Sequence, residues 1–501
     1  MSISNPPLPS RRMSVALACA AAILLAGCAG RSPWQAAQVA SGFASHHICT
    51  DVFVTGLDPE RARTERVRVQ RGMGLVDWAM RVQVDAAQGT VRSTIAGGFP
   101  SLAVHRAGQG CRLIEDDAAM PQPLTVPVGS TVASASFSAA PSSPGGLAPA
   151  IPASPAATAA ASPSSNSALQ AALARAFDEP AAPPFHHTLA TVVWRDGVQV
   201  AERYAPGLGP QTPVLGFSAS KSITHALIGI LVRQGRLSLS QPVPIAAWAG
   251  PGDPRGAITV EQLLRQTSGL DMRQDNSGFD PNALMLYVER DKAAFVAARP
   301  LFAPPGTVWN YTDGHYVLLS RLLRDAVGGT EADVRAFAQR ELFRPLDMAH
   351  TTMEFDTTGT PMGASFFLAS ARDWARLGQL YLDDGVVDGK RLLPEGWTAS
   401  ARRPTLDTGY GAGWWTNALG GRLVPHWGVP WGLPHAPSDA YFARGYMGQF
   451  VVVVPSRRLV IVRLAISAVK GDDIEAADRL VGDVLSALGD PPDKVTARGR
   501  D

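Results

Sequence analysis

The sequence has little net charge and few lysines, and each shortage bears on function. Among 501 residues the basic and acidic side chains nearly cancel, leaving a formal net charge of +2. No run of basic residues stands out, so the charge does not predict a nucleic-acid-binding protein. Lysine occurs only at positions 221, 292, 390, 470 and 494, and arginine supplies the remaining basic charge. A lysine placed inside an apolar segment is therefore notable in this chain.

The first 28 residues have the features of an export signal. Arg11 and Arg12 precede a short apolar core, Val15 to Leu25, which is too short to span a bilayer permanently. The segment then ends in Leu-Ala-Gly-Cys28, which resembles the processing box of bacterial lipoproteins. The resemblance implies that Cys28 becomes the lipidated N-terminus of a membrane-anchored protein facing the periplasm. A plain signal peptide or a short core helix is the alternative.

Cysteine is scarce as well, and its few positions divide between this signal and the segment after it. Cys19 lies in the part expected to be removed and Cys28 is the lipid site, which leaves Cys49 and Cys111. In an exported protein two such cysteines most simply form a disulfide. A metal site that includes the histidine pair just before Cys49 is the competing interpretation, but the ligand spacing is lacking. We therefore expect a structural disulfide and no metal or other cofactor.

Composition divides the chain into five parts. After the signal peptide, residues 1–28, we expect a small β-rich domain at 29–118 that the disulfide closes. Residues 119–166 are rich in Pro, Ala and Ser and cannot bury enough surface to fold, so they form a linker. The largest domain follows at 167–490, and a short tail occupies 491–501. The strand-like segments of the small domain are Cys49 to Val54, Val67 to Val69, Met80 to Val84, Thr90 to Ile95 and Leu102 to His105.

Strand signals lie at both ends of the large domain, with helical signals between them. Two alternating apolar runs flank Asp196-Gly197 and predict a hairpin with a type I′ turn. The runs Gln449 to Val454 and Leu459 to Ile466 predict another hairpin, followed by an amphipathic helix at 472–488. Residues from about 240 to 400 are mainly helical in pattern. We therefore expect an α+β fold, with one antiparallel sheet flanked by helices and an inserted all-helical subdomain.

The segment Gly216 to Val232 is the candidate catalytic element. Ser218 lies where the segment turns helical, and Lys221 follows three residues later on the same helical face. The residues after Lys221 are almost all apolar, so the helix should be buried, and burial disfavours a charged lysine. A neutral lysine can deprotonate Ser218, and the helix N-terminus favours the negative charge that develops during attack. A second Ser-x-x-Lys, at 467–470, precedes a turn without a helix, and we interpret it as chance.

Further motifs follow in the order that a known family would place them. Asn-Tyr311-Thr-Asp313-Gly resembles the Tyr-x-Asn element of class C-type serine β-lactamases and their penicillin-binding relatives. Gly445-Tyr-Met-Gly-Gln449 precedes the strand where that family has Lys-Thr-Gly or His-x-Gly. Supporting matches lie at 263–270, 342–348 and 369–378. The resemblance covers about 185–470, implies a β-lactamase/transpeptidase-like fold, and looks closest to the 6-aminohexanoate-dimer hydrolase (nylon-oligomer hydrolase) branch.

This resemblance implies a hydrolase that works through an acyl-enzyme on a small ester or amide. Ser218 would be the acylated nucleophile, Lys221 its activating base, and Tyr311 the second acid/base that relays a proton to the leaving group. A lysine ammonium near Tyr311 would stabilise the phenolate, which would let the phenol exchange protons at neutral pH. The backbone N–H groups of Ser218 and Gln449 would form the oxyanion hole.

Two departures from the family pattern bear on the substrate. Asp313 stands where β-lactamases have asparagine, and its carboxylate would repel an anionic substrate. The residues Tyr446, Met447 and Gly448 lack the basic group that those enzymes place near a substrate carboxylate. Both departures disfavour penicillins and cephalosporins, although Arg444 beside the motif could supply the missing charge.

Aromatic residues upstream of Gly445 are candidates for a wall of the substrate cleft. Trp414 and Trp415 either line that cleft or pack in the core, and the sequence leaves both interpretations open. Two alternatives to an esterase or amidase also remain open. One is β-lactamase or DD-peptidase activity, and the other is a non-catalytic envelope lipoprotein that binds peptides.

Overall fold

The computed structural model describes residues 32–114, 166–275, 277–418, 432–467 and 472–489. The predicted signal peptide, Cys28, nearly all of the predicted linker and the tail lie outside these residues. Within them, no helix has the length and apolar character needed to cross a membrane.

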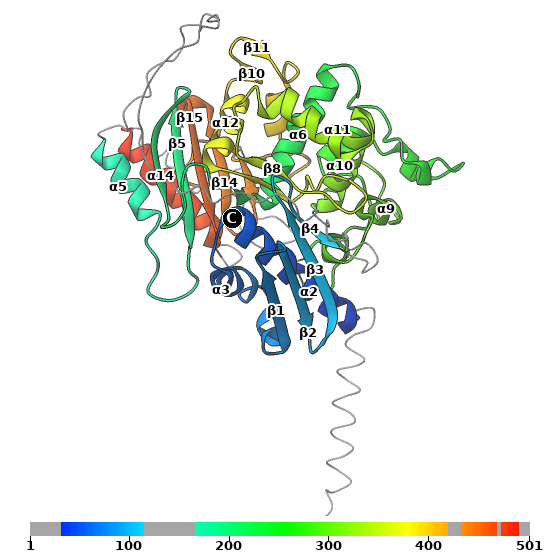
Figure 1. Cartoon of the computed structure of the whole chain (residues 1–501). Coiled ribbons are helices and arrows are strands. Elements are labelled where there is room, and N and C mark those ends of the chain that lie inside the picture. Colours follow the sequence, from blue (N-terminus) through cyan, green and yellow to red (C-terminus); the bar gives the residue numbers. More distant parts are fainter. Residues whose placement is uncertain (1–31, 115–165, 276, 419–431, 468–471, 490–501) are drawn as a thin grey trace, which may run out of the picture.

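A six-stranded antiparallel sheet lies at the centre of the large domain (Figure 1), in the strand order β12-β13-β14-β15-β5-β6. The strands are β5 (Thr188–Arg195), β6 (Val198–Tyr204), β12 (Trp415–Thr416), β13 (Tyr441–Gly445), β14 (Gln449–Val454) and β15 (Leu459–Ala465). Both predicted hairpins are confirmed, because β5 pairs with β6 and β14 pairs with β15. Asp196 and Gly197 have φ of +52° and +79°, as a type I′ turn requires.

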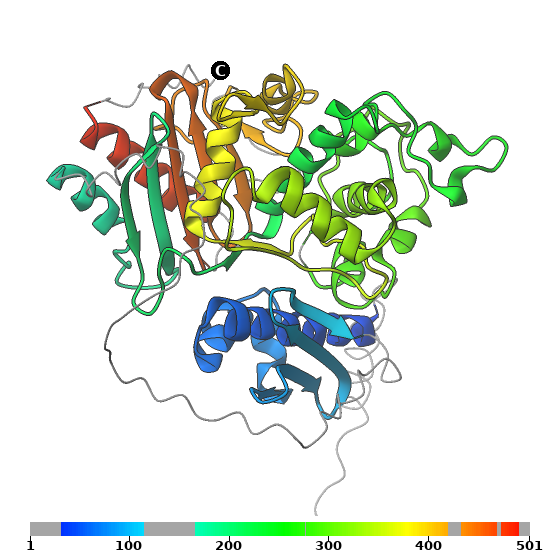
Figure 2. The same ribbon diagram turned by 45° about the horizontal axis from the view of Figure 1, so that its top comes forward.

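Both faces of the sheet are buried at its central strands β14 and β15, which explains why these two are nearly continuous apolar runs, whereas the edge strand β6 is only partly buried. Phe450, Val452 and Val454 of β14 belong to the core shared with α5 (Ser167–Arg175) and α14 (Asp472–Ala487). Val451 and Val453 alternate with them and belong to the opposite core, against α12 (Ala371–Leu382). Figure 2 shows α5 and α14 on one side of the sheet and α12 on the other.

The helices between β6 and β13 form a region beside the sheet, which confirms the inserted helical part of the fold. At its centre is α6 (Ser220–Arg233), whose residues from Ser220 to Leu231 are all buried. The other helices are α7 (Val260–Leu264), α8 (Pro281–Tyr287), α9 (Lys292–Ala297), α10 (Asp313–Val327), α11 (Glu331–Ala338) and α13 (Trp397–Arg402). Two small sheets connect them: β7 (Val214–Leu215), β9 (Phe367–Ala369) and β8 (Thr351–Met353) in one, and β10 (Val386–Val387) with β11 (Lys390–Arg391) in the other.

The N-terminal domain combines one long helix with a four-stranded antiparallel meander. Helix α2 (Pro33–Thr50) packs on the sheet of β1 (Met80–Asp85), β2 (Thr90–Ile95), β3 (Gly98–Arg106) and β4 (Gly110–Ile114). Two very short helices, α3 (Pro59–Arg61) and α4 (Met73–Val76), lie in the connection from α2 to β1. The predicted disulfide is confirmed: Cys49 at the end of α2 is bonded to Cys111 in β4, with their Cα atoms 6.2 Å apart.

The expectation of a β-rich domain is therefore only partly correct. The strands predicted at 80–84, 90–95 and 102–105 are present, whereas Cys49 to Val54 and Val67 to Val69 are not strands. Residues 49–55 are helical because they continue α2. This helix begins at Ser32-Pro33, with a capping serine and a proline in the first turn. The β-branched residues after Cys49 favoured a strand locally, and packing of the long helix on the sheet overrides that preference.

The N-terminal domain packs directly against the large domain (Figure 2). The carboxylate of Glu354, which is 1% exposed, accepts hydrogen bonds from the backbone N–H of Cys111 at 2.7 Å and from Thr50 at 3.3 Å, and also contacts His46 Nε2 at 2.8 Å. Helix α2 meets α8 so closely that a Cβ on Gly42 would lie 2.5 Å from the carbonyl oxygen of Tyr287. The contact between the two domains is thus both polar and tightly packed.

Candidate active site

Ser218 lies in a constrained turn directly before α6. Phe217 to Ala219 form a 3₁₀ turn, and Phe217 has a φ of +44°, a costly conformation for a residue with a Cβ. Gly216 permits this turn because a Cβ there would lie 2.4 Å from the Trp374 ring. The backbone therefore holds the half-buried Ser218 at the N-terminal end of a buried helix, where negative charge is favoured.

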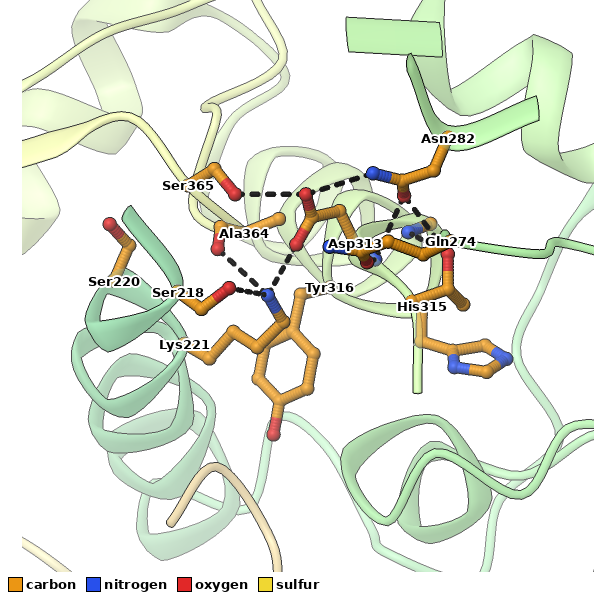
Figure 3. A network of polar contacts seen from close by, with 12 residues as sticks. Ser218, Ser220, Lys221, Gln274, Asn282, Asp313, His315, Tyr316, Ala364 and Ser365 are labelled. Carbon is orange, nitrogen blue, oxygen red and sulfur yellow. Dashed lines mark hydrogen bonds and ion pairs between the residues drawn. The ribbon is translucent and has the colours of Figure 1, made fainter. Parts of the chain in front are cut away.

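Lys221 is buried, 1% exposed, and its amine contacts three acceptors (Figure 3). Nζ donates to Ser218 Oγ at 3.0 Å, to the Ala364 carbonyl oxygen at 3.0 Å, and to Asp313. An ammonium has three N–H donors, so these contacts match its full donor set. The expected Ser218–Lys221 contact is present in the structure.

Asp313 has a position that the sequence did not predict. Its carboxylate is 2% exposed and forms an ion pair with Lys221. The other carboxylate oxygen accepts from Asn282 Nδ2 at 3.1 Å and Ser365 Oγ at 2.9 Å (Figure 3). The expectation that Asp313 would repel an anionic substrate is therefore not supported, because its charge is matched by Lys221.

Sequence analysis missed Asn282, Ser365 and Ala364, which complete this network. They lie on different segments, and no motif joins them to Ser218. The one local signal is Asp280-Pro281, which caps α8 and thereby orients Asn282. Asn282 Oδ1 also accepts from the backbone N–H of Asp313 at 3.0 Å. The side-chain amide of Asn282 therefore bonds to both the backbone and the carboxylate of Asp313.

Tyr311 lies over the same amine, although its ionisation differs from the expectation. Lys221 Nζ is 4.9 Å from the centre of the Tyr311 ring, so the cation faces the ring. Burial and then the Asp313 charge raise the pKa of the Tyr311 phenol above its ordinary value, against lowering effects of a hydrogen bond with Ser218 and of Arg444. The expectation of a stabilised phenolate is wrong, because burial outweighs the cations nearby.

The hairpin between β13 and β14 brings Tyr446 and Met447 to the site but not Gln449. Gly445 packs so closely on the segment before Ser218 that a Cβ there would lie 2.0 Å from the Gly216 carbonyl oxygen. Gln449 pairs with Gly445 across the hairpin, and its side-chain amide bonds to backbone carbonyls, including that of Ala465 at 2.7 Å. Gln449 is fully buried and does not line the cavity described below, so its position does not support the predicted oxyanion role.

Gly448, the remaining residue of this motif, has φ of +90° and faces the β15 side of the hairpin. A Cβ there would lie 2.2 Å from the Arg463 guanidinium. It does not line the cavity, so its contribution is to the shape of the turn rather than to substrate contact.

The two adjacent tryptophans have different environments. Trp414 is fully buried and packs on Tyr381 and Tyr441, with ring centroids 4.4 and 5.4 Å away, so it is a core residue. Trp415 lies 5.4 Å from the Tyr311 ring and lines the cavity. Of the two interpretations that the sequence left open, the cleft wall fits Trp415 and core packing fits Trp414.

A cavity of about 680 Å³ contains Ser218, Tyr311 and Asp313 in its wall. Arg444 of β13 lines it as well, which places a cation inside the cavity. Much of the remaining wall is formed by the N-terminal domain, through α2 and the segment 69–76. Sequence analysis assigned no role in the site to that domain. Among the described residues, no group of three or more His, Cys, Asp or Glu side chains could hold a metal ion.

The fold and the site together define a class of protein. The model of the beta-lactamase family matches residues 173–486, so the chain belongs to that family of serine hydrolases. The chain is 28% identical over 250 residues to the 6-aminohexanoate-dimer hydrolase of Paenarthrobacter ureafaciens. That match covers 44% of this chain and 60% of the relative, so the chain spans less than two thirds of that hydrolase.

Solved structures show the same fold. A Bacillus anthracis protein assigned as a 6-aminohexanoate-dimer hydrolase is similar with a TM-score of 0.51 and 23% identity, over 62% of this chain and 81% of that one. A penicillin-binding protein homologue from Caulobacter crescentus has a TM-score of 0.50 and 19% identity, over 64% of this chain and 97% of that one. The family match begins at residue 173, so the N-terminal domain has to be understood from its own contacts.

Proposed function

We propose that this protein is a serine hydrolase that cleaves an ester or amide through an acyl-enzyme on Ser218. The observation that carries the proposal is the 3.0 Å contact between the buried Lys221 Nζ and Ser218 Oγ, at the wall of a cavity large enough for a small substrate. The 6-aminohexanoate-dimer hydrolase similarity supports the same reaction type.

In the proposed reaction the ammonium of Lys221 first gives one proton to its hydrogen-bonded neighbour Asp313. The neutral amine then accepts the Ser218 hydroxyl proton while Oγ bonds to the substrate carbonyl carbon. Backbone N–H groups at Ser218 and in the cavity-lining part of the 445–447 hairpin would stabilise the oxyanion. Because its pKa is raised, Tyr311 acts as a protonated phenol that donates to the leaving group. Water then gives a proton to the Tyr311 phenolate and attacks the acyl carbon. Lys221 returns a proton to Ser218 Oγ as the acyl group leaves as the acid, and Asp313 returns its proton to Lys221, so the site is restored.

Labelling with a fluorophosphonate probe tests this function. The wild type should be labelled at neutral pH, because an activated serine attacks phosphorus, and Ser218→Ala should not be. Ser220→Ala is the matched control, since Ser220 lies two positions later, is buried, and its hydroxyl accepts a hydrogen bond from the Phe367 backbone N–H instead. An unlabelled wild type would favour the alternative of a non-catalytic peptide-binding protein.

A comparison of two substrates tests the remaining alternative, β-lactamase or DD-peptidase activity. We expect kcat/KM for p-nitrophenyl butyrate to exceed that for nitrocefin at least tenfold, because Tyr446 and Met447 offer no cation to a β-lactam carboxylate. Arg444 is the cation that could reverse this order, since it lines the cavity. If nitrocefin is the better substrate and Arg444→Leu abolishes its turnover, β-lactamase becomes the leading activity.

We also propose that the protein is a periplasm-facing lipoprotein anchored through Cys28. The Leu-Ala-Gly-Cys sequence supports this location, and a buried disulfide between Cys49 and Cys111 fits an oxidising compartment. Mass spectrometry of the protein isolated from membranes should find an acylated Cys28 as the N-terminus. Release of a Cys28→Ser variant in soluble, unacylated form is the expected control, and an unacylated wild type would contradict the anchor.

A further inference from the structure

The wall of the cavity contributed by the N-terminal domain is mainly apolar. On α2 it consists of small and apolar residues at helical spacing, Pro33, Ala36, Ala37, Ala40 and Phe43. The segment 69–76 adds Val69, Met73, Leu75 and Val76. The alanines of α2 leave room in front of the helix, because their side chains end at Cβ.

The large domain faces this wall with more apolar residues. Phe279, Ala283 and Leu286, at and beside α8, line the same cavity. Leu75 and Phe279 are 79% and 39% exposed, so the apolar lining continues to the mouth of the cavity. Apolar surface open to solvent in this way marks a binding surface for an apolar group.

Polar contacts fix this wall beside the nucleophile. Gln70 accepts from Tyr446 OH at 2.6 Å, and its Nε2 lies 3.4 Å from Met447 Sδ. The Arg66 guanidinium lies 5.4 Å from the centre of the Phe217 ring, one residue before Ser218. The N-terminal wall is thus connected to both segments that border the nucleophile.

The direction of a bound substrate follows from where the leaving-group donor lies. Tyr311 packs with Trp309, Tyr410 and Trp415, a cluster of the large domain alone. A leaving group that receives its proton from Tyr311 is therefore directed toward that cluster. The acyl part then extends past Phe217 toward α2.

We propose that the N-terminal domain forms the acyl subsite and selects substrates with a linear aliphatic acyl chain. This inference rests on the proposed function, and it names the substrate class of the Ser218 site. The N-terminal domain would act by placing an apolar wall beside the acyl chain. Burying each additional CH₂ of the chain against this wall should raise kcat/KM about two- to fourfold until the cavity is filled.

A series of p-nitrophenyl esters from acetate to dodecanoate tests the subsite. For the wild type, kcat/KM should rise from acetate to octanoate. In Ala40→Trp, the new indole would occupy the space in front of α2, and the octanoate-to-acetate ratio should fall at least tenfold. Gln35→Trp is the matched control, because Gln35 is exposed on the same helix and does not line the cavity; its ratio should equal that of the wild type. Ala37→Leu, a smaller intrusion, should move the optimum to a shorter ester.

Binding of a fluorescent fatty acid to the Ser218→Ala protein separates this inference from the proposed function. Saturable binding that Ala40→Trp abolishes supports the subsite even where no ester is hydrolysed, and the proposed function then fails alone. Hydrolysis of acetate with no preference for longer chains, and no binding of the fatty acid, overturns the subsite while the proposed function stands. An unchanged octanoate-to-acetate ratio in both Ala40→Trp and Ala37→Leu overturns it as well.

Discussion

The two walls of the cavity differ in how they are built. The catalytic wall is a polar network. Lys221 and Asp313 form an ion pair with each other, Lys221 hydrogen-bonds to Ser218, and Asp313 accepts hydrogen bonds from Asn282 and Ser365. The N-terminal wall presents mostly apolar side chains and keeps its own ion pair, Asp51–Arg66, behind the surface. The difference indicates a division of work in which one wall supplies reactivity and the other supplies selectivity. Changes to the first should alter the rate for every substrate, and changes to the second should alter stability and chain-length preference.

The largest expected effect is on the catalytic wall. Lys221→Ala should lower kcat/KM for p-nitrophenyl acetate by about 10³- to 10⁴-fold, because it removes the proposed base. It also leaves Asp313 as a buried, unpaired carboxylate, which should cost about 3–5 kcal/mol of unfolding free energy. Both quantities can be measured on one preparation, by steady-state kinetics and urea unfolding.

Two further variants separate the chemical effect from the structural one. Asp313→Asn added to Lys221→Ala should recover stability without recovering activity, because it removes the unpaired charge but restores no base. Lys292→Ala is the matched control, since Lys292 is also buried, 3% exposed, but lies on α9 away from the cavity. More than a tenth of wild-type activity in Lys221→Ala would contradict the assignment of the base.

The next effect concerns the ion pair behind the N-terminal wall. Asp51 and Arg66 are both 0% exposed, so Arg66→Met leaves a buried carboxylate and should lower the unfolding free energy by about 3–5 kcal/mol. Arg63→Met breaks a partly exposed ion pair with Asp77 on the same domain and should cost about 0.2–1 kcal/mol. Urea unfolding monitored by tryptophan fluorescence gives both values, and equal values for the two variants would contradict the buried pair's importance.

Tyr311→Phe should have a smaller effect than the lysine variant, about 10²-fold in kcat/KM, because the phenol assists the leaving group rather than activating the nucleophile.

The pH dependence of the wild type follows from the raised pKa of Tyr311. A raised pKa keeps the proton on the phenol to higher pH, so ionisation of Tyr311 should produce no fall in wild-type kcat/KM below about pH 10. A loss of activity near neutral pH that disappears in Tyr311→Phe would show that the phenol ionises earlier. Esters with poorer leaving groups than p-nitrophenolate should be more sensitive to the substitution.

The sequence was informative about the first wall because its elements are local. Ser218 and Lys221 are one helical turn apart, and Tyr311 precedes α10 within a short motif. Their spacing in the sequence is therefore enough to predict their catalytic roles. The charge balance was not local: Asp313 was predicted to face substrate, and its ion pair with Lys221 joins residues 92 positions apart. Gln449 was misassigned for a related reason, since the register of the β13–β14 hairpin decides which of its residues reach the cavity.

The second wall could not be predicted from the sequence. Its alanines at 36, 37 and 40 read as an ordinary helix face, and only docking onto α8 makes that face part of a cavity with Ser218. The disulfide was predictable because Cys49 and Cys111 are the two cysteines outside the predicted signal peptide. The helix that carries Cys49 was not, because β-branched residues around the cysteine favoured a strand.

The smallest expected effect lies where the two walls meet. Tyr446 of the β13–β14 hairpin donates to Gln70 of the N-terminal domain at 2.6 Å, and both residues line the cavity. Tyr446→Phe removes only the hydroxyl and should lower the unfolding free energy by about 0.5–1.5 kcal/mol. If the bond couples the two walls, Gln70→Ala should have less effect in the Tyr446→Phe background than in the wild type, with a coupling energy of about 0.5 kcal/mol or more in a double-mutant cycle.

The octanoate-to-acetate ratio should fall two- to threefold in either single variant, because a loosened N-terminal wall holds the acyl chain less well, while kcat/KM for acetate changes less than this ratio. Additive energies in the cycle, together with an unchanged ratio, would mean that the bond does not position the acyl subsite, and that close packing such as that of Gly42 on Tyr287 holds the walls together instead.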